Sequence, residues 1–420
     1  MTTRPNYERV PDASPPAPSQ PSTVRAPGYA ARMRWVTILY LAQGFPAGVF
    51  RKVWPIYFRD HGVSLTKIGL ISLLGLPYTL KPLWAPLVDR YGDRRVWIAA
   101  CLAAMSVFLG VQPFFDPAHP TIVLWGVMLA FTLASATQDI AIDAHTIAML
   151  EKGEEGAANG IRVAAWRVAY IGSGGLLLAV AGRAGWIPMY LIGAAFLLLM
   201  APIVLRAPKT ELAAAERRLV FKPLVHWLSR PASIATLAFI LLFKLGDQAI
   251  SPMLEVFWRD RGMTLDQIAF ISNTLGVIAT IIGALTGGFL TTRIGLIPSL
   301  IGMGATQVLS NLVYAAVAYT GGGKWPIYLA GTFESFTQGL GTAAFLALLM
   351  ALCDKEHAGT QYALLSALFA LTRDVSGAAS GWATDLLGYG PFFLYTAFLS
   401  LPAFALLPWV KRRLAATGRA

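Results

Sequence analysis

The stretch "YFRDHGVSLTKIGLIS" (residues 57–72) recurs 200 positions later as "FWRDRGMTLDQIAFIS" (residues 257–272). Seven of the 16 aligned positions are identical, and Thr137-Gln138 recurs at the same offset as Thr337-Gln338. Similarity at a fixed offset indicates an internal repeat. The second half of the chain is therefore predicted to be a diverged copy of the first.

The composition places both copies in a membrane. Hydrophobic residues make up 56% of the 420 residues, charged residues make up 13%, and the mean hydropathy is +0.57, values outside the range of soluble domains. Apolar runs long enough to cross about 30 Å of hydrocarbon recur along the chain. Breaks at polar, Gly and Pro clusters predict twelve spans, near residues 34–58, 65–88, 95–115, 120–150, 157–182, 184–206, 231–257, 265–291, 295–320, 325–353, 358–386 and 388–410.

Basic residues gather in segments that flank the predicted spans. The N-terminal segment, the loop 206–230 and residues 411–420 each hold more Lys and Arg than Asp and Glu. By the positive-inside rule these segments face the cytoplasm, so both termini are predicted to be cytoplasmic in a multi-pass protein of the bacterial inner membrane. The net charge of +12 then requires no nucleic acid as a partner.

The predicted organisation has five parts. Residues 1–33, rich in Pro and Ser, form a disordered tail, and the other parts are a six-helix bundle (34–206), a cytoplasmic linker (207–230), a second six-helix bundle (231–413) and a short tail (414–420). The two cysteines, Cys101 and Cys353, lie in apolar spans, which excludes a disulfide framework and a cysteine metal site. We expect no cofactor and no metal. The spans hold no catalytic constellation, and we expect a monomeric transporter, not an enzyme.

Two repeated six-helix halves around a central cavity are the architecture of the major facilitators, so the predicted fold class is an all-α membrane protein of twelve helices. The stretch "APLVDRYGDRR" (85–95) resembles the superfamily's loop motif Gly-x-x-x-Asp-Arg-x-Gly-Arg-Arg. That motif closes the cytoplasmic side in the family, and the resemblance implies a gate of Asp89, Arg90, Gly92 and Arg94. "GFLTTRIG" (288–295) is a decayed second copy with Thr292 in place of the acid.

Two carboxylates stand one helical turn apart in "TQDIAIDA" (137–144). Asp139 and Asp143 lie on one helix face, and an acid inside a membrane span normally faces a cavity or a partner. We predict that they take up and release a proton as access alternates. The alternative is a structural pair bonded to Arg162 or Arg167 of the next span.

Other charges inside spans have two interpretations each. Lys244 and Asp247, one turn apart, either form an ion pair or contact substrate. Lys81 either lines the cavity or reaches the membrane interface. Glu334 is the one charge of its span and is predicted to be functional.

Three further side chains complete the set of candidates. Arg373 and Asp374 are adjacent and point to different faces of a helix, so each is predicted to need another partner. His145 is either a packed residue or a proton relay, and packing is the commoner role.

Seven stretches across both halves carry a more specific resemblance. The chain resembles the AmpG family of muropeptide permeases in "QGFPAG" (43–48), "LKPLWAPLVDRY" (80–91), "ATQDIAIDA" (136–144), "KLGD" (244–247), "TLGVIATIIGAL" (274–285), "GTAAFLALLMALC" (341–353) and "TQYALLSALFAL" (360–371). The resemblance implies proton-driven import of GlcNAc-anhydro-muropeptides across the bacterial inner membrane. It also implies that Gln138, Asp139, Asp143, Lys244 and Asp247 are functional positions.

The leading hypothesis is a proton-coupled importer of an anionic solute that bears sugar or peptide. Positive charge for the substrate carboxylates would come from Lys81, Arg162, Arg167, Lys244 and Arg373, and Trp166 would lie against a sugar ring. The alternatives are a siderophore permease of the same fold and an efflux transporter.

Overall fold

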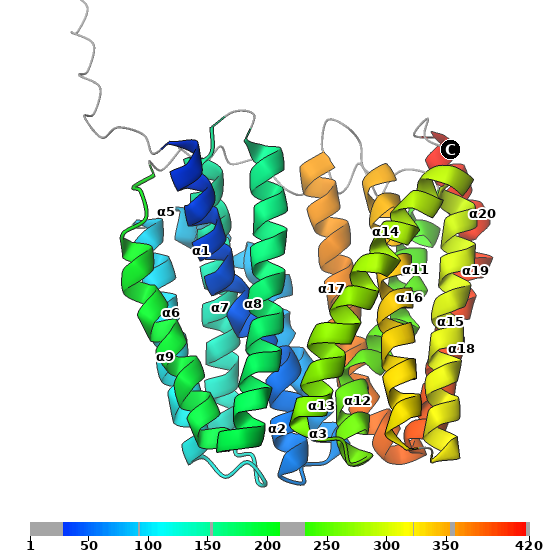
Figure 1. Ribbon diagram of the computed structural model, residues 1–420. Coiled ribbons are helices and arrows are strands. Elements are labelled where there is room, and N and C mark those ends of the chain that lie inside the picture. The colour runs from blue at the N-terminus through cyan, green and yellow to red at the C-terminus, as the bar shows by residue number, and fades with distance from the viewer. Residues whose placement is uncertain are drawn as a thin grey trace, which may run out of the picture.

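The computed structural model describes residues 28–90, 93–151, 154–210, 232–321, 323–352 and 358–416. All regular secondary structure in these ranges is helical. The helices form two groups side by side, and α1 begins at the same end of the bundle at which the C-terminal helix α20 ends (Figure 1). We call this the terminal end and the opposite one the distal end. The predicted tail up to residue 27 and linker residues 211–230 lie outside the described residues.

The first group holds every described helix up to Leu205. Helix α1 begins at Tyr29, five residues before the start of the predicted span, and its first turn carries Arg32, whose guanidinium pairs with Glu151 and Glu154 at 2.8 and 2.5 Å. The elements are α1 (Tyr29–Gly48), the π-helix η1 (Val49–Val53), α2 (Trp54–Asp60), α3 (Leu65–Leu70), the 3-10 helix η2 (Ile71–Gly75), α4 (Leu76–Leu80), the 3-10 helix η3 (Lys81–Leu83), α5 (Ala85–Arg90), α6 (Arg94–Val111), the 3-10 helix η4 (Gln112–Phe114), α7 (Ile122–Met149), α8 (Glu155–Ala184) and α9 (Trp186–Leu205).

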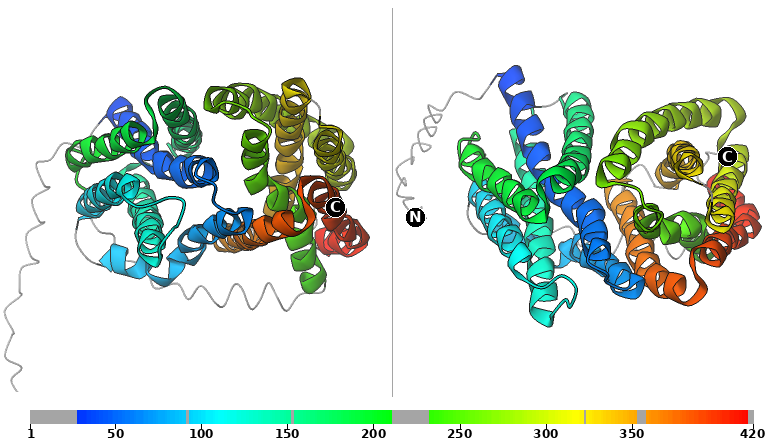
Figure 2. Two further views of the ribbon diagram at one scale, coloured as in Figure 1. Left: turned by 90° about the horizontal axis from the view of Figure 1, so that it is seen from below. Right: turned by 60° about the horizontal axis from the view of Figure 1, so that its bottom comes forward.

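The second group repeats this plan with fewer breaks. Seen from below, it lies beside the first group, with the blue helices α2 and α3 and the orange helix α17 at the junction (Figure 2). The elements are α11 (Ser233–Phe243), α12 (Leu245–Asp260), α13 (Leu265–Phe270), the π-helix η5 (Ile271–Leu275), α14 (Gly276–Ile294), α15 (Leu296–Thr320), α16 (Lys324–Ala351), α17 (Ala358–Leu387), α18 (Tyr389–Leu399), α19 (Leu401–Ala405) and α20 (Leu407–Ala416).

The repeated stretch forms the same structure twice. Each copy ends a helix with a glycine of positive φ, +78° at Gly62 and +76° at Gly262, a conformation that suits a residue without Cβ. The next helices then start after Ser64 and Thr264, and Thr264 forms a capping box with Gln267. The repeat therefore sets the two distal turns, α2 to α3 and α12 to α13.

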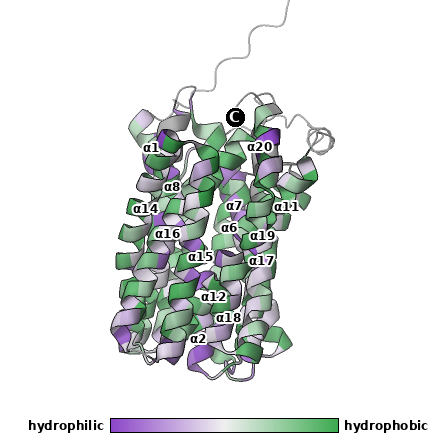
Figure 3. Cartoon of the chain, turned by 90° about the vertical axis from the view of Figure 1, so that its right-hand side faces the viewer, coloured by the Kyte–Doolittle hydropathy of each residue, from purple (hydrophilic) through white to green (hydrophobic). Residues whose placement is uncertain are grey.

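Seven helical stretches among the described residues are long and apolar enough to cross a membrane, and the bent run α18–α20 is an eighth candidate. Helices α16 and α17 are not among these stretches. They carry Glu334, Arg373 and Asp374, and such polar side chains lower their mean hydropathy. Hydrophobic residues cover much of the helix surface in Figure 3, and hydrophilic ones gather at the distal turns. The bundle is therefore a membrane-spanning one, and the count of twelve spans stays a prediction.

The two groups approach most closely where α3 meets α17. A Cβ added to Gly381 would lie 1.9 Å from the carbonyl oxygen of Leu65, and one added to Gly69 would lie 2.8 Å from the Gly381 nitrogen. Only glycine permits this backbone contact. The small residues of α17 thus bring the halves together on the distal side of the cavity described next.

Candidate functional site

A cavity of about 620 Å³ lies between the two helix groups. It is lined from both halves, and its polar and aromatic lining includes Gln43, Arg51, Lys52, Tyr78, Asp139, Trp166, Arg167, Tyr170, Lys244, Glu255, Asn273, Glu334, Gln338 and Arg373. Five of the ten candidates for the proton and substrate site lie on it, namely Asp139, Arg167, Lys244, Glu334 and Arg373. The other five, Gln138, Asp143, Lys81, Arg162 and Asp247, do not belong to this lining.

The first carboxylate, Asp139 on α7, is paired. The ammonium of Lys81, which begins η3, donates a short hydrogen bond to Asp139 Oδ2. Asp139 is buried, with 8% of its surface exposed. Lys81 does not belong to the cavity lining, and its ammonium instead pairs with Asp139, which does.

The second carboxylate, Asp143, is held within the same half. Tyr40 Oη donates to Asp143 Oδ1 at 2.5 Å, and Arg162 Nη2 donates to the same oxygen at 3.3 Å. The Arg162 guanidinium also lies over the Tyr40 ring, 4.9 Å from its centre. The pairing with Arg162 that the sequence left open is present at Asp143, whereas Arg167 has no ion pair among the described residues.

Lys244 and Asp247 form the ion pair that their spacing allowed. The Lys244 ammonium lies 3.0 Å from Asp247 Oδ2, at the break between α11 and α12. Lys244 is 1% exposed, so this pair satisfies a charge that burial would otherwise make costly. Gln138, also fully buried, donates to the Ala42 carbonyl at 3.4 Å.

The prediction that Arg373 and Asp374 cannot neutralise each other is wrong, although Asp374 does have the further partner that was predicted. Arg373 Nε lies 3.4 Å from Asp374 Oδ1, because its long side chain folds back toward its neighbour. Arg51 of the first half reaches the same oxygen at 3.7 Å. One buried carboxylate thus serves two guanidiniums, and the cluster keeps an excess positive charge beside the cavity.

A second ion pair joins the halves and was missed from the sequence. Lys52 on η1 lies 2.5 Å from Glu255 Oε1 on α12, and Ser272 Oγ donates to the same oxygen at 2.7 Å. Two adjacent cations inside an apolar span, Arg51-Lys52, are the signal that could have identified it.

Glu334 lies on α16 and faces the cavity. Its carboxylate accepts long hydrogen bonds from Gln338 Nε2 at 3.4 Å and Ser335 Oγ at 3.5 Å. The described residues give it no ion pair. Across the cavity, Trp166 and Tyr170 of α8 stack with ring centres 5.1 Å apart and planes at 9°, which makes a flat aromatic surface.

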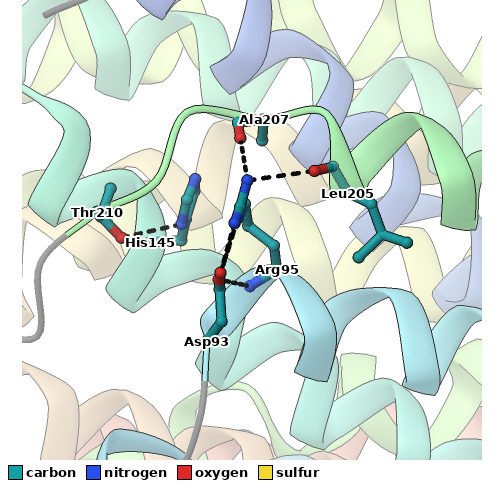
Figure 4. Close-up of polar contacts among 6 residues, drawn as sticks. All are labelled: Asp93, Arg95, His145, Leu205, Ala207 and Thr210. Carbon is teal, nitrogen blue, oxygen red and sulfur yellow. Dashed lines mark hydrogen bonds and ion pairs between the residues drawn. The ribbon is translucent and has the colours of Figure 1, made fainter. Parts of the chain in front are cut away.

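The loop motif sits at the terminal end. Asp93 caps α6 by accepting from the Arg95 backbone nitrogen at 2.9 Å, and its carboxylate binds the Arg95 guanidinium at 2.5 Å. Figure 4 shows that Arg95 also donates to the carbonyls of Leu205 and Ala207, at 3.2 and 2.8 Å. The Arg95 guanidinium holds the pKa of the Asp93 carboxyl below its usual range.

The predicted gate is described only in part. Gly92 lies outside the described residues, as do the side chains of Asp89 and Arg90. Arg94 is buried and donates to the Ala144 carbonyl of α7 at 3.3 Å, a contact within the first half. His145 is fully buried, with Nδ1 3.2 Å from Thr210 Oγ1 (Figure 4), as the packed interpretation requires.

At the distal end the repeated Arg-Asp pairs bind each other across the halves. Arg59 binds both oxygens of Asp260 at 2.6 Å, and Arg259 forms a short contact with Asp60. Tyr389 Oη and Trp186 Nε1 add hydrogen bonds to Asp260 and Asp60 at 2.7 and 3.2 Å. We call Arg59–Asp260 and Arg259–Asp60 the distal ion pairs.

A membrane-spanning helical bundle with a charged cavity between two repeated halves defines the class of secondary transporters. The Major Facilitator Superfamily model matches residues 36–245 and 236–419. The anhydromuropeptide permease of Escherichia coli is 35% identical over 384 residues, which cover 88% of this chain and 78% of that protein. The chain belongs to the major facilitator superfamily and, within it, to the family of anhydromuropeptide permeases, which confirms the resemblance seen in the sequence.

Other relatives agree with this assignment. A protein of Rickettsia felis named putative transporter AmpG 4 is 25% identical, covering 91% of this chain and 97% of its own length. Among solved structures, the nucleoside transporter NupG superposes with a TM-score of 0.72 at 15% identity, covering 90% of this chain and 99% of its own. A bacterial homologue of the transporter Spinster gives 0.73 at 14%, with coverages of 93% and 99%. These two structures establish the fold alone.

Proposed function

We propose that this protein is a proton-coupled importer of GlcNAc-anhydro-muropeptides across the bacterial inner membrane. The observation that carries the proposal is the cavity between the halves, where guanidiniums from both halves and a stacked aromatic pair face the same space. The relative in Escherichia coli is named for this class of solute. A muropeptide combines the two chemistries that such a lining suits, sugar rings and carboxylates.

The sugar and the peptide are assigned to different parts of the lining. The flat face of Trp166 and Tyr170 offers apolar contact for a sugar ring. Arg167 has no ion pair in the described part of the chain, and Arg51 and Arg373 share one carboxylate. Each guanidinium therefore keeps N–H donors for a substrate carboxylate, the geometry in which Arg binds anions best.

The membrane topology extends the same proposal. Twelve spans in one monomer, with the terminal end in the cytoplasm, agree with the Lys and Arg excess of the termini and the central loop. The distal ion pairs then lie on the periplasmic side.

The sequence pattern predicts Asp139 and Asp143 as the residues that couple transport to protons. Both are held by partners of their own half, Lys81 for Asp139 and Tyr40 with Arg162 for Asp143. A proton at either site would have to displace these partners. Asp139→Asn tests this directly, with uphill accumulation in proteoliposomes under a pH gradient as the readout. Accumulation equal to that of the wild type would remove Asp139 from the coupling role.

The experiment that tests the function itself is uptake of labelled GlcNAc-anhydro-muropeptide into proteoliposomes, with and without an inward proton gradient. A ferric siderophore serves as competitor. We expect accumulation that depends on the gradient and that the siderophore leaves unchanged. Uptake inhibited by the siderophore would favour the permease alternative, and absence of uptake would reject the substrate while leaving the fold intact.

A further inference from the structure

The carboxylates in and around the cavity differ in how their charge is balanced. Five of them have a cationic partner at ion-pair distance. These pairs are Asp139 with Lys81, Asp143 with Arg162, Asp247 with Lys244, Glu255 with Lys52, and Asp374 with both Arg51 and Arg373. Glu334 stands apart, because the described residues give it no ion pair.

The position of Glu334 makes an uncompensated charge costly. Counting ten residues from the distal start of α16 at 1.5 Å each puts it about 15 Å along the helix, near the middle of a membrane span. A carboxylate at such a depth is expensive unless a cation or several hydrogen bonds stabilise it. Ser335 and Gln338 supply two hydrogen bonds of 3.4 Å or longer, which is weak compensation.

The cations whose charges act on Glu334 from other elements are already paired with other carboxylates. The groups whose charges act on it are Asp247 of α12, Lys244 at the break before α12, and Lys52 of η1. Lys244 and Lys52 each hold another carboxylate, at 3.0 and 2.5 Å. Arg373 of α17 lines the same cavity and holds Asp374. Lys244–Asp247 and Lys52–Glu255 are neutral pairs. The excess positive charge of Arg51, Arg167 and Arg373 lines the same cavity but forms no ion pair with Glu334 among the described residues. Adding a proton removes the charge of Glu334 without rearranging any of these pairs.

We infer that Glu334 is the site at which the coupled proton binds. The inference rests on the proposed proton-driven import. One proton adds to a carboxylate oxygen of Glu334 to form an O–H bond, no other bond changes, and the proton leaves once the cavity opens to the other side. An ionised Glu334 repels an anionic substrate in the same cavity and a protonated one does not, so each ligand favours binding of the other.

A direct test uses infrared difference spectra of the purified full-length protein, recorded between acidic and alkaline pH without substrate. A protonated carboxyl group has its own carbonyl stretch, and we expect Glu334→Gln to remove one such band. Asp139→Asn and Asp143→Asn should keep it, and Glu334→Asp should shift it. A spectrum of Glu334→Gln identical to that of the wild type would overturn the inference, whatever the protein transports.

Transport of labelled GlcNAc-anhydro-muropeptide gives the second readout. In Glu334→Gln we expect accumulation under a proton gradient to fall about tenfold or more, while exchange against preloaded unlabelled substrate continues. The exposed Asp116, which among the described residues is bonded only to its neighbours Ala118 and His119, gives the control Asp116→Asn, which should transport like the wild type. Loss of exchange together with accumulation would make Glu334 a substrate or structural residue and overturn the inference. A wild type that fails to transport, with the infrared band still lost in Glu334→Gln, would reject only the proposed substrate.

Discussion

The two ends of the bundle are held in different ways. At the distal end the strongest contacts cross between the halves, because Arg59 binds Asp260 and Arg259 binds Asp60. At the terminal end two sets of polar contacts lie within the first half, where Arg95 binds the carbonyls of Leu205 and Ala207 and Arg32 binds Glu151 and Glu154. Ion pairs therefore hold the two halves together at the distal end, whereas at the terminal end these contacts stabilise the first half alone.

The repeats account for this difference. Arg-Asp occurs at the same place in both copies, so two similar halves facing each other form two reciprocal pairs. The acid of the loop motif, Asp89, is present only in the first copy, since the second copy has Thr292 at that position. A transporter that opens toward its distal side must break the distal ion pairs, whereas Arg95 can keep its contacts throughout.

The largest effect is expected from removing both distal acids. Each ion pair is partly exposed and worth up to about 1 kcal/mol, so Asp60→Asn with Asp260→Asn should raise the population open at the distal end about 5- to 30-fold. The measurement is the rate at which an impermeant maleimide, added on the distal side, labels Ser72→Cys. Cys101 and Cys353 are replaced by Ala for this purpose.

A charge exchange serves as the control for that experiment. The variant with Arg59→Asp and Asp260→Arg reverses one distal ion pair and leaves Arg259–Asp60 unchanged. Its Ser72→Cys thiol should be labelled nearly as slowly as in the parent protein. If the exchange labels as fast as the double Asn variant, the pairs do not hold the halves together. Equal labelling rates in the parent protein, the double Asn variant and the exchange variant would also contradict the conclusion that the distal ion pairs hold the halves together.

A smaller effect is expected at the terminal end. Arg95→Met removes hydrogen bonds to the Leu205 and Ala207 carbonyls, and because the first of these is exposed to solvent the loss is about 0.5–1.5 kcal/mol. The melting temperature in detergent should fall by a few degrees, and distal labelling of Ser72→Cys should not change. The matched variant is Arg293→Met, since Arg293 of the second motif copy is exposed and lies over Phe289. An equal fall in melting temperature in Arg95→Met and Arg293→Met would contradict the role of Arg95 in holding the end of α9.

The fold was largely predictable because it depends on local patterns. Apolar runs, the repeat at 57–72 and the loop motif predicted a two-halved helical bundle, and the superfamily match confirms it. The charged residues were harder. Sequence spacing indicated the pair Lys244–Asp247 as one of two interpretations. It could not show the pair of Lys52 with Glu255, because these residues are 203 positions apart. Pairing between halves depends on how the bundles face each other, which no local pattern encodes.

The smallest predicted effect concerns Asp93 and follows from the sign of its pKa shift. Because Arg95 lowers the pKa of Asp93 in the folded protein, ionised Asp93 contributes stability above its unfolded pKa of about 3.9 and loses it as the pH falls further. The melting temperature of the wild type should therefore exceed that of Asp93→Asn at neutral pH, and the gap should narrow below about pH 4. The effect is small because 35% of the Asp93 side chain is exposed. The pKa values of Asp116 and Glu154 are also lowered, by hydrogen bonds from His119 and Arg32, but these groups are common to both proteins and cancel in the difference. A gap that stays constant or widens in acid would mean that Asp93 acts on α6 only as a neutral cap, and that Arg95 holds the end of α9 without it.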